Sequence, residues 1–370
     1  WRGGVLTYGG LSVFVVAFVM YPFAAILFKE ANYAKRLLPG LLWMGIFTYS
    51  MVAIPGTPQI QNIIPTAFFG TTTWAGIGLG LIGAALYFVM AWGWVSYRAK
   101  KLQAAGEGYG TNLTNEPEKS SEDLPDWKLS AIPLVMVILL NLIISNPFNW
   151  SWAYHWNENS LVSLAPLNLS LLAASVGKIQ AIWSISVALI LSSVAAAIIG
   201  RKRFIRKKEN FLQTINFGAA SSCAAVLNVA SGFAFGSVLV AMPGFLPIKE
   251  ILLGIADSAG PLVSAVVTTN IMCGVTGSAS GGLTIALSML GDTWAQMASA
   301  QGISADALHR IVSIASVGID PVPHCGALVT LLAICGLTHK EAYYDIIILM
   351  GLKFLVPFLC VLFYMFTGIA

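Results

Sequence analysis

Two polar, helix-breaking strings interrupt long apolar stretches of this 370-residue chain. The first, PGTPQIQN, occupies residues 55–62 inside the apolar segment 41–70. The second, GVTGSASGG, occupies residues 274–282 inside the segment 264–290. Proline lacks the N–H group that a helix requires, and glycine relaxes the backbone. Each string therefore predicts a discontinuous helix, and in hydrocarbon such a backbone survives where it lines a protein cavity or a ligand site.

The unwound backbone and the side chains of these strings suit a small anion. Free N–H groups at a half-helix N-terminus attract negative charge, hydroxyl groups add donors, and amide side chains recognise hydroxyl groups. Neither string contains arginine, so we expect a small carboxylate held largely by backbone dipoles. Close helix packing through small residues is the alternative, and the pairing of two such breaks favours the binding site. The candidate substrate-binding residues are Thr57, Gln59, Asn62, Asn270, Thr276, Gly277, Ser278, Ser280 and Gly281.

Asp320 and His324 are ionisable residues within the apolar run 309–336. Pro321 and Pro323 disfavour a regular helix and predict a bend that aims both side chains inward. Imidazole titrates near physiological pH, and ionisable groups inside a membrane segment are functional candidates. We expect this pair to couple transport to protons. The alternative is a structural Asp–His hydrogen bond that holds a proline kink.

The other ionisable and sulfur-containing residues predict no catalytic or metal site. We interpret His309 and Arg310 as interface anchors, and Asp345 and Lys353 as groups near a helix end or facing a scaffold. The five cysteines have no metal-ligand spacing and read as small packing residues. No cofactor, metal or enzymatic activity is expected.

The composition is that of a membrane protein. The chain is 57% hydrophobic and 10% charged, with a mean hydropathy of +0.79, whereas soluble domains are about 45–50% apolar and about 25% charged. Apolar runs near the roughly 20 residues that span a bilayer predict helices rather than an outer-membrane barrel. We expect an all-α polytopic fold with about nine or ten membrane-embedded segments, from the roughly 30 Å thickness of the hydrocarbon core.

Charge and element order predict the organisation of the chain. The basic string RKRFIRKK at 201–208 follows an apolar run, which is typical of a cytoplasmic anchor rather than a nucleic-acid site. Paired broken helices indicate two inverted repeats, with re-entrant hairpin tips at Gly9–Gly10 and within 231–236. The membrane side of 146–178 stays open. The expected parts are a first repeat at 1–96 (hairpin arm, broken helix 41–70 and a span), incomplete before Trp1; a flexible cytoplasmic loop at 97–130; scaffold helices at 131–209; and a second repeat at 210–370 (hairpin, broken helix 264–290, spans 309–336 and 343–366).

Several long strings resemble the gluconate:proton symporter (gluconate permease) family of the ion transporter superfamily. They are PGTPQIQN at 55–62, GSASGG at 277–282, His309-Arg310 leading to DPVPHCGA at 320–327, and LTHKEAY at 337–343. The resemblance implies a multi-pass bacterial inner-membrane permease for gluconate or related hydroxy and keto acids, driven by protons. It also implies a dimerisation scaffold beside a mobile transport domain, and a homodimer. Cys325 stands where many relatives have Asn.

Other functions stay open at this point. Unwound carbonyls also bind Na⁺, so a sodium-coupled carboxylate carrier is an alternative. A passive channel would share the apolar composition. Ser280 and His324 could form a dyad of an intramembrane serine protease, but residue 278 is Ser where that motif needs Gly. The absence of phosphate-loop and metal motifs from the sequence disfavours an ATP-driven pump or a metalloenzyme.

Overall fold

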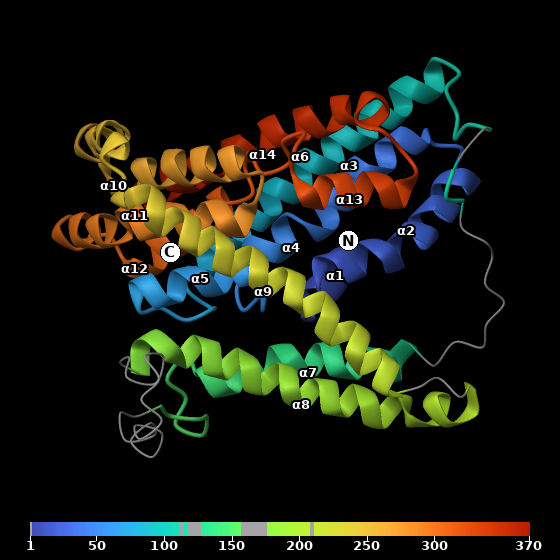
Figure 1. The fold of residues 1–370 in the computed structure, drawn as a ribbon, viewed down its shortest axis with the longest axis horizontal. Coiled ribbons are helices and arrows are strands. Elements are labelled where there is room, and N and C mark those ends of the chain that lie inside the picture. Colours follow the sequence, from blue (N-terminus) through green and yellow to red (C-terminus); the bar gives the residue numbers. More distant parts are fainter. Residues whose placement is uncertain (1, 112–113, 117–126, 157–175, 208–210) are drawn as a thin grey trace.

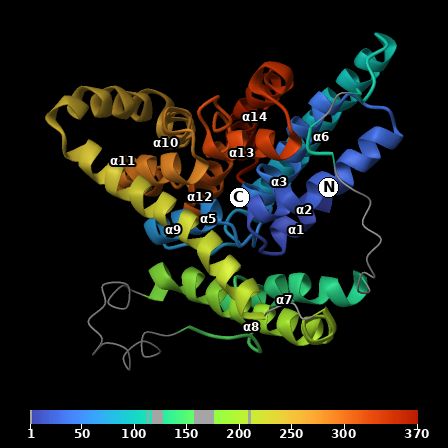
Figure 2. The same ribbon diagram turned by 45° about the vertical axis from the view of Figure 1, so that its right-hand side comes forward.

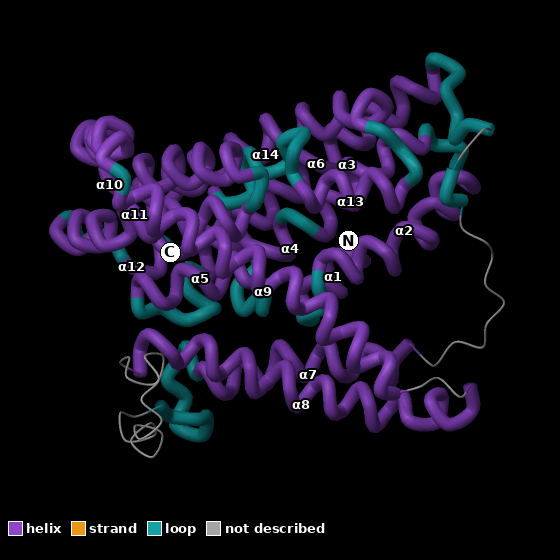
Figure 3. The backbone as a smooth tube through the Cα atoms, in the orientation of Figure 1, coloured by secondary structure: helices purple, strands orange, loops and turns teal. Residues whose placement is uncertain are grey.

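The computed structural model describes residues 2–111, 114–116, 127–156, 176–207 and 211–370. Over these residues the chain is helical and has no strand (Figures 1 and 3). Six of the described helices are long and apolar enough to cross a membrane. They are Val13–Glu30, Ile77–Ala104, Lys128–Ser145, Gln180–Arg201, Glu250–Thr276 and His339–Thr367. The polytopic helical class predicted from composition is thereby confirmed.

The first part of the chain begins with a short helical hairpin. Gly10 has a φ of +92°, a conformation that suits glycine, in the turn between α1 and α2. Gly3 in α1 packs beside Met20 in α2. The helices are α1 (Arg2–Tyr8), α2 (Val13–Glu30), the 3-10 turn η1 (Lys35–Leu37), α3 (Leu38–Ile46), α4 (Tyr49–Val52), α5 (Ile60–Phe69) and α6 (Ile77–Ala104).

The chain leaves helical geometry between α4 and α5, where the prolines Pro55 and Pro58 lie. The break at residues 53–59 is the one predicted over 41–70. A further interruption at residues 47 and 48 separates α3 from α4. The helix resumes at Ile60, so Asn62 lies inside α5.

Two helices of the middle region pair with each other and pack against α5 and the residues before it. α7 (Trp127–Ser145) and α8 (Val176–Lys207) run side by side beneath the other helices, and α9 (Phe211–Ala241) crosses from them to the remaining body (Figures 1 and 2). The predicted hairpin tip within 231–236 is wrong, because α9 runs through it without interruption. Residues 157–175, which include most of the stretch whose membrane side was left open, lie outside the described residues.

The last part of the chain contains a second, longer hairpin. It comprises η3 (Pro243–Phe245), α10 (Leu246–Thr276) and α11 (Ala279–Ala300), followed by α12 (Ala305–Ala315), α13 (Gly326–Cys335) and α14 (His339–Thr367). α10 is bent at Gly260, whose φ is +84°. The indole Nε1 of Trp294 in α11 donates to Ser264 Oγ in α10 at 3.1 Å, so the two helices run back along each other.

Two predicted elements differ in this region. The broken helix expected over 264–290 is instead two helices that pack against each other, with a turn at Gly277–Ser278 between them. Their close approach is possible because Gly282 lies against the backbone of Cys273, where there is no room for a side chain. The span expected over 309–336, with a bend at its prolines, consists of two helices, α12 and α13, separated by the non-helical residues 316–325. Pro321 and Pro323 lie in that break, where they withhold two helical donors.

Residues 114–116, which belong to the described part of the predicted flexible loop after α6, make specific contacts with other elements. Lys35 is 2% exposed, and its ammonium binds Thr114 O at 2.7 Å and Glu116 Oε1 at 2.8 Å. Thr114 Oγ1 donates to Gly336 O, and Asn115 Nδ2 to Ala333 O. The described part of the loop therefore joins η1 to the C-terminus of α13, where helix carbonyls lack partners.

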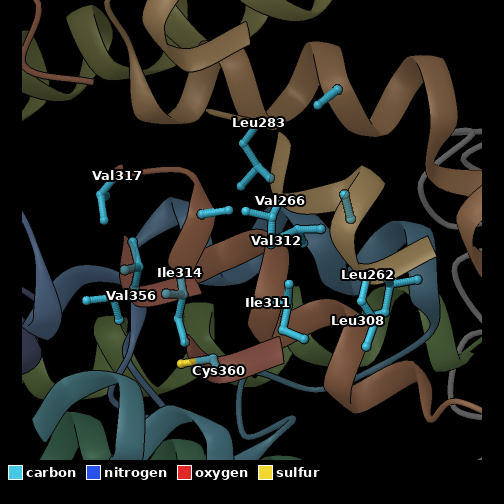
Figure 4. Close-up of a cluster of buried hydrophobic side chains, with 14 of the residues drawn as sticks. Leu262, Val266, Leu283, Leu308, Ile311, Val312, Ile314, Val317, Val356 and Cys360 are labelled. Carbon is cyan, nitrogen blue, oxygen red and sulfur yellow. The ribbon is translucent and has the colours of Figure 1, made fainter. Parts of the chain in front are cut away.

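The largest apolar core lies between α10, α11, α12 and α14. Figure 4 shows Ile311, Val312 and Ile314 of α12 among side chains from the neighbouring helices. A second core joins α2, α3 and α13. The first break (residues 53–59) and the second break (residues 316–325) lie beside these cores. The surrounding helices therefore hold their irregular backbone in place.

Candidate functional site

Polar side chains in and beside the first break donate hydrogen bonds to its backbone carbonyl groups and to those of neighbouring residues. Thr57 Oγ1 donates to Ser50 O at 2.9 Å. Asn62 Nδ2 donates to Thr57 O at 2.9 Å and to Thr73 O at 2.8 Å. Thr57 and Asn62 are fully buried. These bonds replace donors that the prolines remove from the helix, and they join the break to the loop after α5.

Arg310 of α12 uses all of its N–H groups to bind residues that flank the first break and residues of the loop after α5. Its Nε and Nη2 donate to Ala75 O, its Nη1 to Val52 O and Asn62 Oδ1, and its Nη2 also to Thr73 O, at 2.6–3.2 Å. The side chain is 0% exposed. No acidic side chain of the described residues forms an ion pair with it. The hydrogen-bond acceptors of its guanidinium are thus backbone carbonyl oxygens and the amide oxygen of Asn62.

His309 completes this cluster. One ring nitrogen, Nδ1, lies 2.6 Å from Thr71 Oγ1, and the other, Nε2, lies 3.2 Å from Asn62 Oδ1. The interpretation of His309 and Arg310 as interface anchors is wrong, because both are fully buried. We call the cluster of Arg310, His309 and Asn62 the arginine centre.

The first break also contacts the turn of the first hairpin. Gln59 Nε2 donates to Thr7 O at 2.8 Å and to Leu11 O at 3.1 Å. The hydroxyl of Tyr8 donates to Pro55 O at 2.7 Å. The break and the hairpin turn therefore form one polar unit.

The second break, residues 316–325 between α12 and α13, contains one member of a buried ion pair. Lys353 Nζ of α14 lies 2.7 Å from Asp320 Oδ1, and the two residues are 0% and 3% exposed. The ammonium also lies 5.5 Å from the centre of the Trp43 ring of α3. Asp320 thus pairs with lysine rather than with His324, the partner that the spacing predicted.

His324 lies at the surface, against the turn of the second hairpin. Its Nε2 lies 3.3 Å from Val275 O. A Cβ added to Gly277, whose φ is +59°, would lie 2.8 Å from His324 Cδ2. Ser278 begins α11, and its Oγ accepts from Gly281 N at 3.2 Å. In each part of the chain, a hairpin turn therefore rests on a break.

The remaining predicted residues lie near this second turn. Thr276 Oγ1 donates to Met272 O at 2.8 Å, and Ser280 O accepts from Thr284 Oγ1 at 2.8 Å. Asn270 lies deeper in α10, is fully buried, and has an Oδ1 without a described partner. The structure thus places Thr57, Gln59 and Asn62 at the first break, and the predicted residues from 270 to 281, with Asp320 and His324, at the second.

α7 contributes one polar contact to the first break. Asn141 is fully buried, and its Nδ2 donates to Gly56 O at 3.3 Å and to Thr73 Oγ1 at 3.1 Å. Sequence reasoning missed Asn141, the contacts of His309 and Arg310 with Asn62, and the pairing of Lys353 with Asp320. The available signal was the same for each: a lone polar or charged residue within an apolar helix.

One cavity of the described structure is separate from both breaks. It measures about 400 Å³ and lies between α1, α2, α3 and α6. Its lining is mainly apolar and contains none of the predicted site residues.

Comparison with known proteins gives one near full-length relative. The chain is 38% identical to the uncharacterized transporter YxjC of Bacillus subtilis (strain 168), across 99% of this chain and 78% of the relative. The chain belongs to the family of this transporter. Together with the six apolar helices, the relationship identifies a membrane transport protein. No protein-family model and no solved structure matches the chain.

Proposed function

We propose that the protein is a secondary active transporter of the gluconate permease type. Its substrate is a small organic acid, such as gluconate or a related hydroxy or keto monocarboxylate, and protons drive uptake. The protein acts in the bacterial inner membrane as a homodimer. Asp320 is the proton-coupling candidate, and the two breaks with their hairpin turns supply the substrate-binding residues.

The arginine centre is the observation that supports an anionic substrate. A buried charge is costly unless it is paired, and Arg310 has carbonyl and amide acceptors but no described acidic partner. The other buried cations of the described residues, Lys35, Lys353 and Arg98, each form an ion pair with a carboxylate. The Asp306 carboxylate, one turn earlier in α12, offsets part of this charge without forming an ion pair with Arg310. The remaining positive charge at the first break favours the approach of an anion, because Coulomb attraction is strong where water is excluded.

A repeated architecture supports alternating access. α5 and α13 have ten residues each, and their first residues, 60 and 326, are 266 apart. The same offset relates their left-handed C-terminal glycines, Gly70 and Gly336. Each short helix follows a proline-containing break and precedes a long helix, α6 or α14. We propose that these elements form the two inverted repeats of a transport domain, which moves past a scaffold containing α7 and α8.

A thermal-shift screen of the purified protein tests the substrate class. Gluconate, 3-hydroxybutyrate and pyruvate are compared with sorbitol, a neutral polyol, across pH and with or without sodium. A ligand present at 100 times its dissociation constant stabilises the folded state by about 2.7 kcal/mol. We expect stabilisation by at least one acid and not by sorbitol, with retention in Arg310→Lys and loss in Arg310→Gln. Stabilisation by sorbitol alone, or by none of these compounds, contradicts the proposal.

A further inference from the structure

The ion pair in the second break has a geometry that suits charge exchange. Asp320 and Lys353 come from different elements, the break after α12 and the middle of α14. They meet at 2.7 Å with almost no exposure. The pair is net neutral, and removing the charge of either partner would leave the other buried and uncompensated, which is strongly unfavourable.

Among the described residues, no second charged group forms an ion pair with either partner. The ammonium lies over the ring of Trp43. Val317 and Val356, each three residues from one member of the pair, belong to the apolar core (Figure 4). The hydroxyl of Tyr87 donates to Ile314 O at 2.8 Å. The titratable groups that face the pair or its break are Cys273 of α10, Cys325 before α13, Tyr87 of α6, Tyr343 of α14 and His324 of the break itself.

The break also connects the pair to the surface. Asp320 is buried, whereas Pro323 and His324, three and four residues later, are exposed. His324 lies against the turn of the second hairpin. Opening of this turn would therefore admit water and ions to the carboxylate by a short route.

We infer that Lys353 is the substrate's counter-ion during transport and that Asp320 releases it by taking up a proton. This inference rests on the proposed function. A proton forms an O–H bond with the Asp320 carboxylate, and the ammonium of Lys353 keeps its three hydrogens. The monocarboxylate substrate then pairs with that ammonium. One proton and one monoanion enter together, so the net charge of the site does not change and transport is electroneutral.

Reconstituted vesicles containing the full chain test the inference, with labelled gluconate and 3-hydroxybutyrate as probes. Wild-type protein should accumulate a probe about ten-fold under an inward gradient of one pH unit, because one-to-one coupling transmits the whole tenfold gradient. A membrane potential set with potassium and valinomycin should not change that ratio. Asp320→Asn should still exchange internal for external probe but should accumulate none.

Two further variants separate coupling from folding. Asp345→Asn removes the acid from the other buried ion pair of α14, with Arg98, and should keep the ten-fold accumulation. Asp320→Asn/Lys353→Gln restores a neutral, hydrogen-bonding pair and should be folded by thermal unfolding, yet should lose exchange as well.

Each contrary result has its own meaning. Undiminished accumulation by Asp320→Asn, exchange by the folded double variant, or dependence of wild-type accumulation on membrane potential overturns the inference and leaves the proposed function standing. If wild-type protein transports neither acid under any gradient, the proposed function is refuted and the inference fails with it.

Discussion

Replacing Arg310 with lysine keeps the buried positive charge but removes donors from the first break. The guanidinium makes five hydrogen bonds that tie residues 52, 73 and 75 to Asn62. An ammonium has three N–H donors at a single point, so at least two of these bonds are lost. Hydrogen bonds to charged groups contribute about 1.5–3 kcal/mol each. We therefore expect Arg310→Lys to lower the free energy of unfolding by about 3 kcal/mol or more.

Thermal unfolding in detergent, followed by tryptophan fluorescence, measures this effect. At about 2 °C for each kcal/mol in a large domain, the midpoint should fall by about 6 °C. Arg98→Lys is the matched control, because Arg98 is also buried but faces the Asp345 carboxylate, to which an ammonium can bind. That variant should lose one hydrogen bond, or about half as much stability. Equal midpoints for the two variants would show that the carbonyl contacts of Arg310 do not hold the break.

Two other substitutions test contacts around the breaks. Asn141→Leu removes the bonds from α7 to Gly56 O and Thr73 Oγ1; it should cost about 1 kcal/mol and speed amide hydrogen exchange in residues 53–59, and unchanged exchange would argue against an anchoring role. Gly277→Ala places a side chain at a φ of +59° and against His324; strain of about 1–2 kcal/mol should lower the unfolding midpoint, whereas Gly254→Ala, which meets no neighbour within 4 Å, should not, and similar midpoints for the two would contradict this account of the turn.

Much of the helical framework followed from local chemistry. The low charge content and the apolar runs predict membrane helices, because lipid provides no hydrogen-bond partners for an open backbone. The paired prolines of PGTP at 55–58 and of DPVP at 320–323 disfavour a continuous helix, since proline has no N–H group to donate, although single prolines such as Pro22 in α2 are accommodated within helices. Both segments are non-helical in the structure. Thr57 and Gln59 were accordingly placed in a break.

The partners of the charged residues depended on tertiary structure. Arg310 binds a carbonyl 235 residues away, and Lys353 binds Asp320 across 33 residues and two separate helices. Helical spacing describes neighbours on one helix face, so it suggested His324 as the partner of Asp320 and no partner for Arg310. The central position of Lys353 within an apolar run marks it as unusual, but only the tertiary structure shows that its partner is Asp320.

The GVTGSASGG string shows the same division. Glycine and serine permit the backbone to leave a helix, and that much the sequence alone determined. They permit equally a discontinuous helix or a reversal of direction. The packing of α10 against α11, with the Ser264–Trp294 hydrogen bond and the close approach at Gly282, decided for the reversal. Local conformational freedom is a property of residue type, whereas direction is set by which distant apolar faces bury each other.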